Sequence, residues 1–197
     1  MRKIVLLSAL VLLVGASAFA EGLPNYAALK LGMYIPQATD VEDFDNAFYG
    51  ELAFGHYFNK NFAIELGAGY TKSSASLTIS DTVTTLTVDA DLTIIPVTLG
   101  VKGLLPMGNF EPYAMAGIGA YFAEVEGSAS LTGVGSGSTS ESDTAFGYYL
   151  GLGANFNITK EILLGIEWKY TWAKPNFFDE DVKIDGSLVT ANIGYRF

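Results

Sequence analysis

Residues 162–172 read ILLGIEWKYTW, and large apolar side chains recur at every second position along the stretch. One face of an extended chain would carry Ile162, Leu164, Ile166, Trp168, Tyr170 and Trp172, and the other Gly165, Glu167, Lys169 and Thr171. A period of two residues indicates a β-strand with one apolar face. The charges Glu167 and Lys169 on the opposite face predict a polar interior behind that strand.

The same alternation recurs in seven other segments of the chain. They cover residues 26–35, 47–58, 62–71, 86–105, 112–123, 145–156 and 189–197. No segment after the first twenty residues is apolar for long enough to form a transmembrane helix. The pattern therefore predicts an all-β protein, a transmembrane antiparallel up-and-down β-barrel of eight strands.

The segment 86–105 differs from the others because its apolar parity changes between Ile94 and Ile95. Leu86, Val88, Ala90 and Leu92 precede the change, and Ile95, Val97, Leu99 and Val101 follow it. A β-bulge adds one residue and reverses the two faces, and proline is tolerated at such a site. Pro96 beside the change thus favours a bulge there.

The expected connections alternate between short and long. Residues 59–61, 106–111 and 157–161 form short turns, whereas the stretches near 36–46, 72–86, 124–144 and 173–183 are longer. Short periplasmic turns and longer external loops are typical of outer-membrane barrels, and an even strand count places both termini in the periplasm. The stretch 127–142 is rich in Gly, Ser and Thr and predicts a mobile external loop.

Aromatic residues gather toward both ends of the predicted strands. The short-turn end has Phe58, Phe62, Phe110, Tyr113, Phe156, Tyr195 and Phe197; the long-loop end has Tyr34, Phe48, Tyr70, Phe122, Phe146, Tyr148, Tyr170 and Trp172. Two aromatic girdles with aliphatic residues between them indicate two membrane interfaces.

The N-terminus and the composition bound the class further. Residues 1–20 combine Arg2 and Lys3, an apolar run and the small-residue site Ala18-Phe19-Ala20, which predicts a cleaved signal peptide before one domain at 21–197. The chain has no cysteine, which excludes a lipoprotein anchor. Its net charge of −10 and scattered basic residues exclude a nucleic-acid partner.

Two stretches carry a resemblance to a known family. Residues 95–100, with Glu111-Pro112-Tyr113 and Gly117-Ile118-Gly119, resemble the middle of the small outer-membrane barrels related to OmpX, OmpW and the OmpA barrel. Ile193, Tyr195 and Phe197 resemble the family's C-terminal signature. The resemblance implies a monomer embedded in outer-membrane lipid and a C-terminus read by the barrel-assembly machinery.

Seven charged residues fall on the predicted inward faces. They are Lys30, Glu51, Glu65, Lys102, Glu167, Lys169 and Arg196. Charges in a narrow barrel are costly unless paired, so we expect an ion-paired network that includes both Glu167 and Arg196. Such a network fits a polar plug or a narrow selective channel. An eight-stranded lumen is just wide enough for side chains, which favours the plug, although inward glycines such as Gly55, Gly67, Gly69 and Gly153 could leave room for water.

No catalytic, cofactor-binding or metal constellation is apparent in the sequence. The single histidine, His56, lies on the lipid-facing parity beside a short turn, where it does not fit the pair that a lipid A-modifying enzyme would need. The acidic residues concentrate in the long loops, which could share divalent cations with lipopolysaccharide phosphates. The sequence thus predicts a non-enzymatic barrel with a structural or surface-interaction role.

Overall fold

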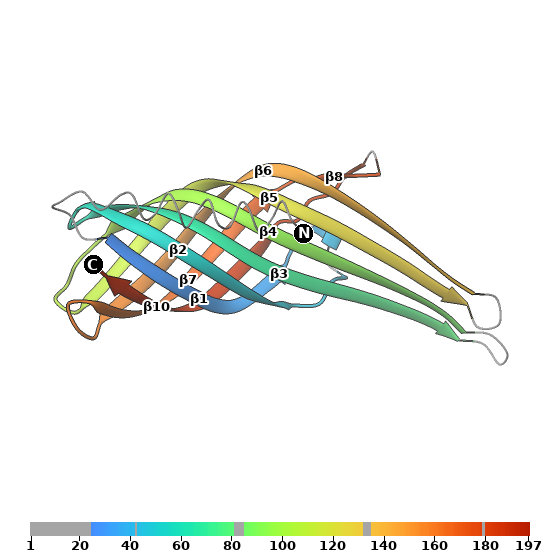
Figure 1. Cartoon of the computed structure of the whole chain (residues 1–197), viewed down its shortest axis with the longest axis horizontal. Coiled ribbons are helices and arrows are strands. Elements are labelled where there is room, and N and C mark those ends of the chain that lie inside the picture. The colour runs from blue at the N-terminus through green and yellow to red at the C-terminus, as the bar shows by residue number, and fades with distance from the viewer. Residues whose placement is uncertain (1–24, 42, 81–84, 132–134, 179) are drawn as a thin grey trace.

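A computed structural model of the chain describes residues 25–41, 43–80, 85–131, 135–178 and 180–197. The predicted signal peptide lies outside these residues. Eight long strands close into one antiparallel barrel in the order β1-β10-β7-β6-β5-β4-β3-β2 (Figure 1). The predicted fold class is therefore confirmed. Among the described residues, no helix is long and apolar enough to cross a membrane.

The barrel strands pair with their neighbours along the chain, and β1 closes the ring by pairing with β10. The barrel strands are β1 Asn25–Pro36, β2 Ala47–Asn59, β3 Phe62–Ser80, β4 Thr85–Leu104, β5 Phe110–Leu131, β6 Gly135–Asn157, β7 Ile162–Ala173 and β10 Gly186–Arg196. The connections contain the 3-10 helix η1 Thr39–Val41 and the short strands β8 Asn176–Phe177 and β9 Glu180–Asp181.

The two faces predicted for residues 162–172 are those of the folded protein. Ile166 on β7 is 68% exposed on the outside of the barrel, whereas its neighbour Glu167 is 3% exposed inside it. The outward side chains of the other strands within the membrane are apolar as well, for example Leu52 and Ile193. Apolar residues on the outside are stable only where lipid replaces water.

Side chains fix the geometry of two of the three short turns, and a glycine with positive φ allows the third. Asn59 Oδ1 accepts hydrogen bonds from the backbone N–H groups of Asn61 and Phe62 at 2.8 and 3.0 Å. Thr159 Oγ1 accepts in the same way from Glu161 and Ile162. Gly108 has a φ of 67°, which a residue with a side chain adopts only with strain. These turns lie where the sequence predicts them, at the end of the barrel that holds Asn25 and Phe197.

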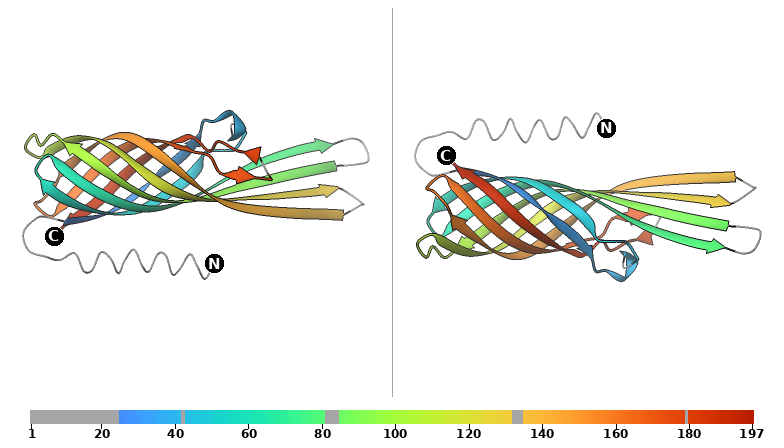
Figure 2. Two further views of the ribbon diagram at one scale, coloured as in Figure 1. Left: turned by 90° about the horizontal axis from the view of Figure 1, so that it is seen from above. Right: turned by 90° about the horizontal axis from the view of Figure 1, so that it is seen from below.

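The predictions of long loops near 72–86 and 124–144 are wrong, because most of these residues belong to strands. β3 and β4 extend to Ser80 and Thr85, and β5 and β6 to Leu131 and Gly135. These four strands run beyond the ring as a four-stranded sheet, here called the projection (Figures 1 and 2). The described parts of 127–142 are thus paired strands and not a mobile loop. Every residue from Gly127 to Leu131 has a partner on both β4 and β6, which satisfies the backbone.

The expected bulge beside Pro96 is also wrong. The β3–β4 register passes from Ala68↔Val97 to Thr71↔Ile94, and the same number of residues is missing from both strands. Pro96 has no N–H to donate, which interrupts the ladder without adding a residue. Ile94 and Leu92 instead point inward and are 4% and 1% exposed.

The apolar residues of β4 change from the outward to the inward face because the strand passes from lipid into water. Within the membrane the outward side chains meet lipid and must be apolar. Beyond it, outward residues such as Asp91 meet water, and the inward residues Leu92 and Ile94 form an apolar core.

One predicted residue of each aromatic girdle does not face the lipid. Tyr34 and Tyr113 point into the barrel and are 3% and 4% exposed. The other predicted girdle residues lie on outward-facing positions, and some contact each other directly. Tyr148 stacks on Trp172 with ring centroids 5.0 Å apart.

Candidate functional site

The centre of the barrel interior holds six of the seven predicted charges. The central charge cluster consists of Lys30, Glu51, Glu65, Lys102, Glu167 and Lys169 from β1, β2, β3, β4 and β7. Each side chain is almost wholly buried, and the three lysines balance the three glutamates. The period-two pattern turns each of them inward, and the strand registers bring them to one level.

Lys30 lies at the middle of this cluster. Its ammonium is 2.9 Å from Glu51 Oε1, 2.8 Å from Glu65 Oε1 and 2.9 Å from Glu167 Oε1. Two outer pairs complete the cluster: Lys102 lies 2.7 Å from Glu65 Oε2 and Lys169 lies 2.9 Å from Glu51 Oε2. Removing Lys30 would leave one carboxylate, that of Glu167, without a short ion pair, because its other two lysine contacts are 3.4 and 3.6 Å.

Inward tyrosines surround the charges. The sequence pattern gave no role to Tyr26 and Tyr49, and it placed Tyr113 in the aromatic girdle at the short-turn end. Tyr26 donates a hydrogen bond to Glu65 at 2.6 Å, Tyr113 donates to Glu167 at 2.9 Å, and Tyr49 donates to Glu51. The Lys102 ammonium lies 4.5 Å from the centroid of the Tyr113 ring, a cation–π contact. The inward parity that these tyrosines share with the charges was the signal that could have identified them.

Four of the inward glycines make room for tyrosine rings. A Cβ at Gly55 would collide with the ring of Tyr26, and one at Gly153 with the ring of Tyr113. Gly69 and Gly117 accommodate Tyr49 and Tyr149 in the same way. At these four positions a tyrosine ring therefore occupies the space that the missing side chain leaves.

Arg196 belongs to a separate group at the short-turn end, so the expected link to Glu167 is wrong. Thr190 is the residue of β10 that pairs with Glu167, and Arg196 lies about 20 Å further along that strand. Arg196 pairs instead with Glu111 at 3.0 Å and also donates to Asn157 at 2.8 Å. Glu111 was missed because it had been assigned to a turn.

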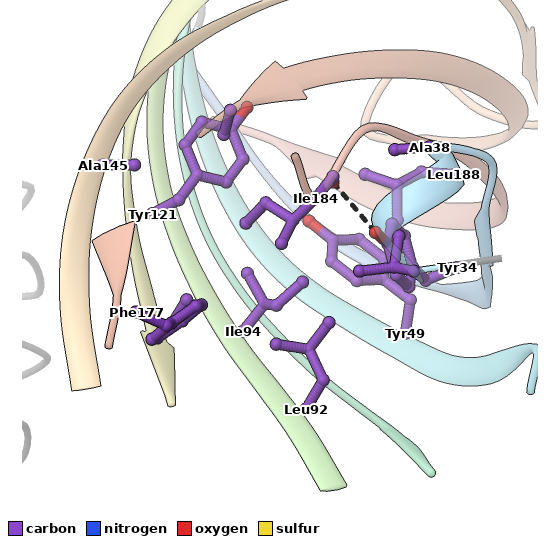
Figure 3. Close-up of a cluster of buried hydrophobic side chains, with 13 residues drawn as sticks. Tyr34, Ala38, Tyr49, Leu92, Ile94, Tyr121, Ala145, Phe177, Ile184 and Leu188 are labelled. Atoms are coloured by element: carbon purple, nitrogen blue, oxygen red, sulfur yellow. Dashed lines mark hydrogen bonds between the residues drawn. The ribbon is translucent and has the colours of Figure 1, made fainter. Parts of the chain in front are cut away.

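The opposite end of the lumen is closed by apolar side chains, here called the mouth cluster (Figure 3). It contains Tyr34, Ala38, Val41, Tyr49, Leu92, Ile94, Tyr121, Ala123, Ala145, Ala173, Phe177, Ile184 and Leu188. The β1–β2 connection supplies Val41, and the β7–β10 connection supplies Phe177 and Ile184. The Tyr34 hydroxyl donates to the carbonyl of Ile184 at 2.9 Å and ties this connection to β1 (Figure 3).

The surroundings of His56, among the described residues, do not suggest hydrolysis. Its Nδ1 lies 2.7 Å from Asn25 Oδ1, and its ring packs edge-on against Phe58 near the short-turn end. In the described part of the chain, no three His, Cys, Asp or Glu side chains come together as a metal site.

These features define the class of the protein as a small membrane β-barrel with a filled interior. Residues 6–197 match the family described as "Outer membrane protein beta-barrel domain", and the chain belongs to this family. It is thus an outer-membrane protein.

Known proteins of similar sequence and structure agree with this placement. A Rickettsia canadensis (strain McKiel) protein with the name "Putative adhesin" is 26% identical over the whole chain and 89% of its own length. A major outer membrane protein from Thermus thermophilus has a TM-score of 0.60 at 13% identity, covering 90% of this chain and all of its own. The outer membrane protein OprG of Pseudomonas aeruginosa has a TM-score of 0.59 at 17% identity, covering 90% and 97%.

Proposed function

We propose that the protein is a monomeric, non-conducting outer-membrane barrel that presents its projection for attachment to other surfaces. It is exported with a cleaved signal peptide, and both chain termini lie in the periplasm. The observation that carries the proposal is the combination of a filled lumen with a sheet of four strands that continues past the membrane girdle. A barrel built in this way anchors the projection.

The interior contacts support a closed barrel over the channel alternative. The mouth cluster, the central charge cluster and the Arg196–Glu111 group fill successive levels of the lumen. An ion crossing the centre would have to separate Lys30 from carboxylates less than 3 Å away. Breaking a buried pair costs about 3–5 kcal/mol, which opposes steady conduction.

The projection supports attachment. It places polar residues at a distance from the lipid surface, and acidic side chains such as Asp89 and Glu126 favour basic partners or divalent cations shared with lipopolysaccharide. The name of the Rickettsia relative points to the same kind of role. A lipid A-modifying enzyme has less support, because His56 is at the short-turn end, away from the projection.

We expect the refolded protein to give no stepwise conductance in planar lipid bilayers. The measurement should compare the wild type with Glu167→Gln at equal protein density, because Glu167 faces all three lysines of the central charge cluster. Steps whose cation selectivity shifts in Glu167→Gln would contradict the closed barrel and favour the channel.

Shortening the projection should abolish attachment while leaving the barrel intact. Residues 76–89 and 128–138 can each be replaced by a two-residue Asn-Gly turn, because Ala75 pairs with Ala90 and Gly127 pairs with Thr139. Cells of a non-adherent laboratory strain carrying either protein are then counted on cultured animal cells. Equal adhesion of both strains, at equal surface levels, would contradict the proposed function.

The C-terminal signature gives a prediction about assembly. The Phe197 N–H donates to the Asn25 carbonyl and its carbonyl accepts from the Asn25 N–H, both at 2.8 Å, while its ring lies 6.1 Å from that of Phe54. Phe197→Ala keeps the backbone bonds but removes the ring that the barrel-assembly machinery would read. We expect several-fold less protein in outer-membrane fractions, and near-normal levels for Phe197→Tyr. Normal levels of Phe197→Ala would show that the ring is dispensable.

A further inference from the structure

The projection has two unlike faces, and its outer face is polar. Ser74, Asp91, Glu126 and Ser140 form one row across the four strands, and Ser76, Asp89, Ser128 and Ser138 form the next. The Lys72 ammonium lies 2.9 Å from Asp91 Oδ2, and the Ser74 hydroxyl donates to Asp91 Oδ1 at 2.7 Å. These two hydrogen bonds lower the pKa of Asp91. Asp89, Glu126 and Ser128 on this face are exposed, so the face meets water.

On β3, β4 and β5 the inner face of the projection is apolar and continues the mouth cluster outward. Leu92 belongs to that cluster, and residues at alternate positions of β4 share its face, which places Ala90 and Val88 there. Val88 pairs with Leu77 on β3 and with Ala129 on β5. Leu77 is 60% exposed and Val88 is 39% exposed, although both lie beyond the outer girdle. An apolar sheet face exposed to water indicates a binding surface.

Two acidic rims border this face at its base. On the β3 side, the Asp45 N–H donates to the Ser74 carbonyl at 2.9 Å, which holds the connection bearing Asp43 and Asp45 against the sheet. The opposite rim is the β8–β9 hairpin with Glu180. The N–H groups of Asn176 and Phe178 donate to Asp143 at 2.6 Å and to Glu141 at 2.8 Å. Figure 2 shows both connections ending where the projection leaves the barrel.

We propose that the inner face of the projection binds a cationic amphipathic segment of a partner polypeptide. Apolar side chains of the segment cover Leu77 and Val88, and its lysines or arginines meet the acidic rims. The negative charge of the two rims selects this occupant over two others. A second copy of the chain, with its net charge of −10, would bring acidic rims together, and anionic lipid headgroups would meet the same repulsion. The inference rests on the proposed attachment function and names the chemistry of its partner.

The test uses the full mature protein refolded in zwitterionic lipid nanodiscs. The probe is a fluorescently labelled synthetic peptide of alternating leucine and lysine, and its anisotropy is followed as protein is added. We expect saturable binding that the double variant Leu77→Ser/Val88→Ser weakens about tenfold. The matched control is Thr78→Ala/Thr87→Ala, a directly paired couple one residue away on the outer face, which should bind as the wild type does.

The charge of the rims is tested separately. Asp43→Asn/Glu180→Gln should weaken binding several-fold and reduce its dependence on salt, because exposed charges act through screened attraction. A peptide of alternating leucine and glutamate should not bind. Heat-modifiable mobility in gels checks that each variant keeps its barrel.

Three results would overturn the inference. The first is equal peptide affinity of the wild type and Leu77→Ser/Val88→Ser, and the second is equal affinity for the lysine and the glutamate peptides. The third is a wild-type dimer in analytical sedimentation that becomes a monomer in the double variant. The adhesion assay separates this inference from the proposed function. If the shortened projection abolishes adhesion but the inner-face variant binds peptide normally, the docking inference fails and the attachment function stands. If shortening leaves adhesion intact, the attachment function fails, and the peptide titration still decides whether the face binds.

Discussion

Replacing Lys30 by methionine should lower the free energy of unfolding by about 3–5 kcal/mol, because the change leaves buried carboxylates without their common partner. Lys30 is 1% exposed and lies within 3 Å of three glutamates on three other strands. Methionine has a similar length and leaves no large cavity, so the loss would report charge and not volume. Urea unfolding of the protein in lipid vesicles measures the difference.

A second neutralisation should recover part of that stability. Lys30→Met/Glu167→Gln leaves the pairs Lys102–Glu65 at 2.7 Å and Lys169–Glu51 at 2.9 Å, which balance each other. The control is Lys72→Met, which removes the exposed partner of Asp91 and should not measurably change unfolding. If Lys30→Met unfolds like the wild type, the centre of the barrel is well hydrated and the closed-barrel proposal loses its basis.

Ile166→Arg should greatly reduce insertion into the membrane. Ile166 lies near the middle of β7, points outward beside Ala154 and Ala191, and is 68% exposed to the surroundings. A cation on the lipid face near the centre of a bilayer costs about 2–4 kcal/mol, and nothing on this face compensates it. The measurement is the folded fraction after refolding into vesicles of fixed thickness.

Ile162→Arg is the matched control on the same strand and face. Ile162 follows the short turn at 157–161, so its arginine would reach the interface, where the cost falls to about 0–1 kcal/mol. We therefore expect Ile162→Arg to insert nearly as well as the wild type. Equal insertion of the two variants would mean that Ile166 does not face the lipid core.

The apolar alternation predicted the barrel well because the membrane imposes it locally. Every outward side chain within the bilayer meets lipid. The alternation in 162–172 and in the other segments therefore identifies the lipid-facing side of each strand without information about the neighbouring strands. The same regularity gave wrong predictions where the strands leave the lipid and enter water. The parity change at Ile94 suggested a bulge, and the Gly-, Ser- and Thr-rich stretch 127–142 suggested a loop, although both belong to strands that leave the membrane.

The inward-facing charges were predicted, but not which of them are in contact, and Arg196 on β10 shows why. The alternation alone turned both Glu167 and Arg196 inward. Whether two inward charges meet depends on how far apart their levels are along the barrel. That distance follows from the register: Thr190 is the partner of Glu167, and Arg196 lies near the chain end beside Glu111.

The sequence by itself therefore determined which side of each membrane strand faces lipid, where the short turns fall and that the charges of the central cluster are buried, because each depends on side chains only one or two positions apart. Only the tertiary structure decided that Lys30 joins three glutamates, that Tyr26 and Tyr113 occupy the spaces beside Gly55 and Gly153, and that β3 to β6 continue as a projection. Those features depend on the stagger between strands distant in the chain, which the closure of the barrel sets and no local pattern encodes.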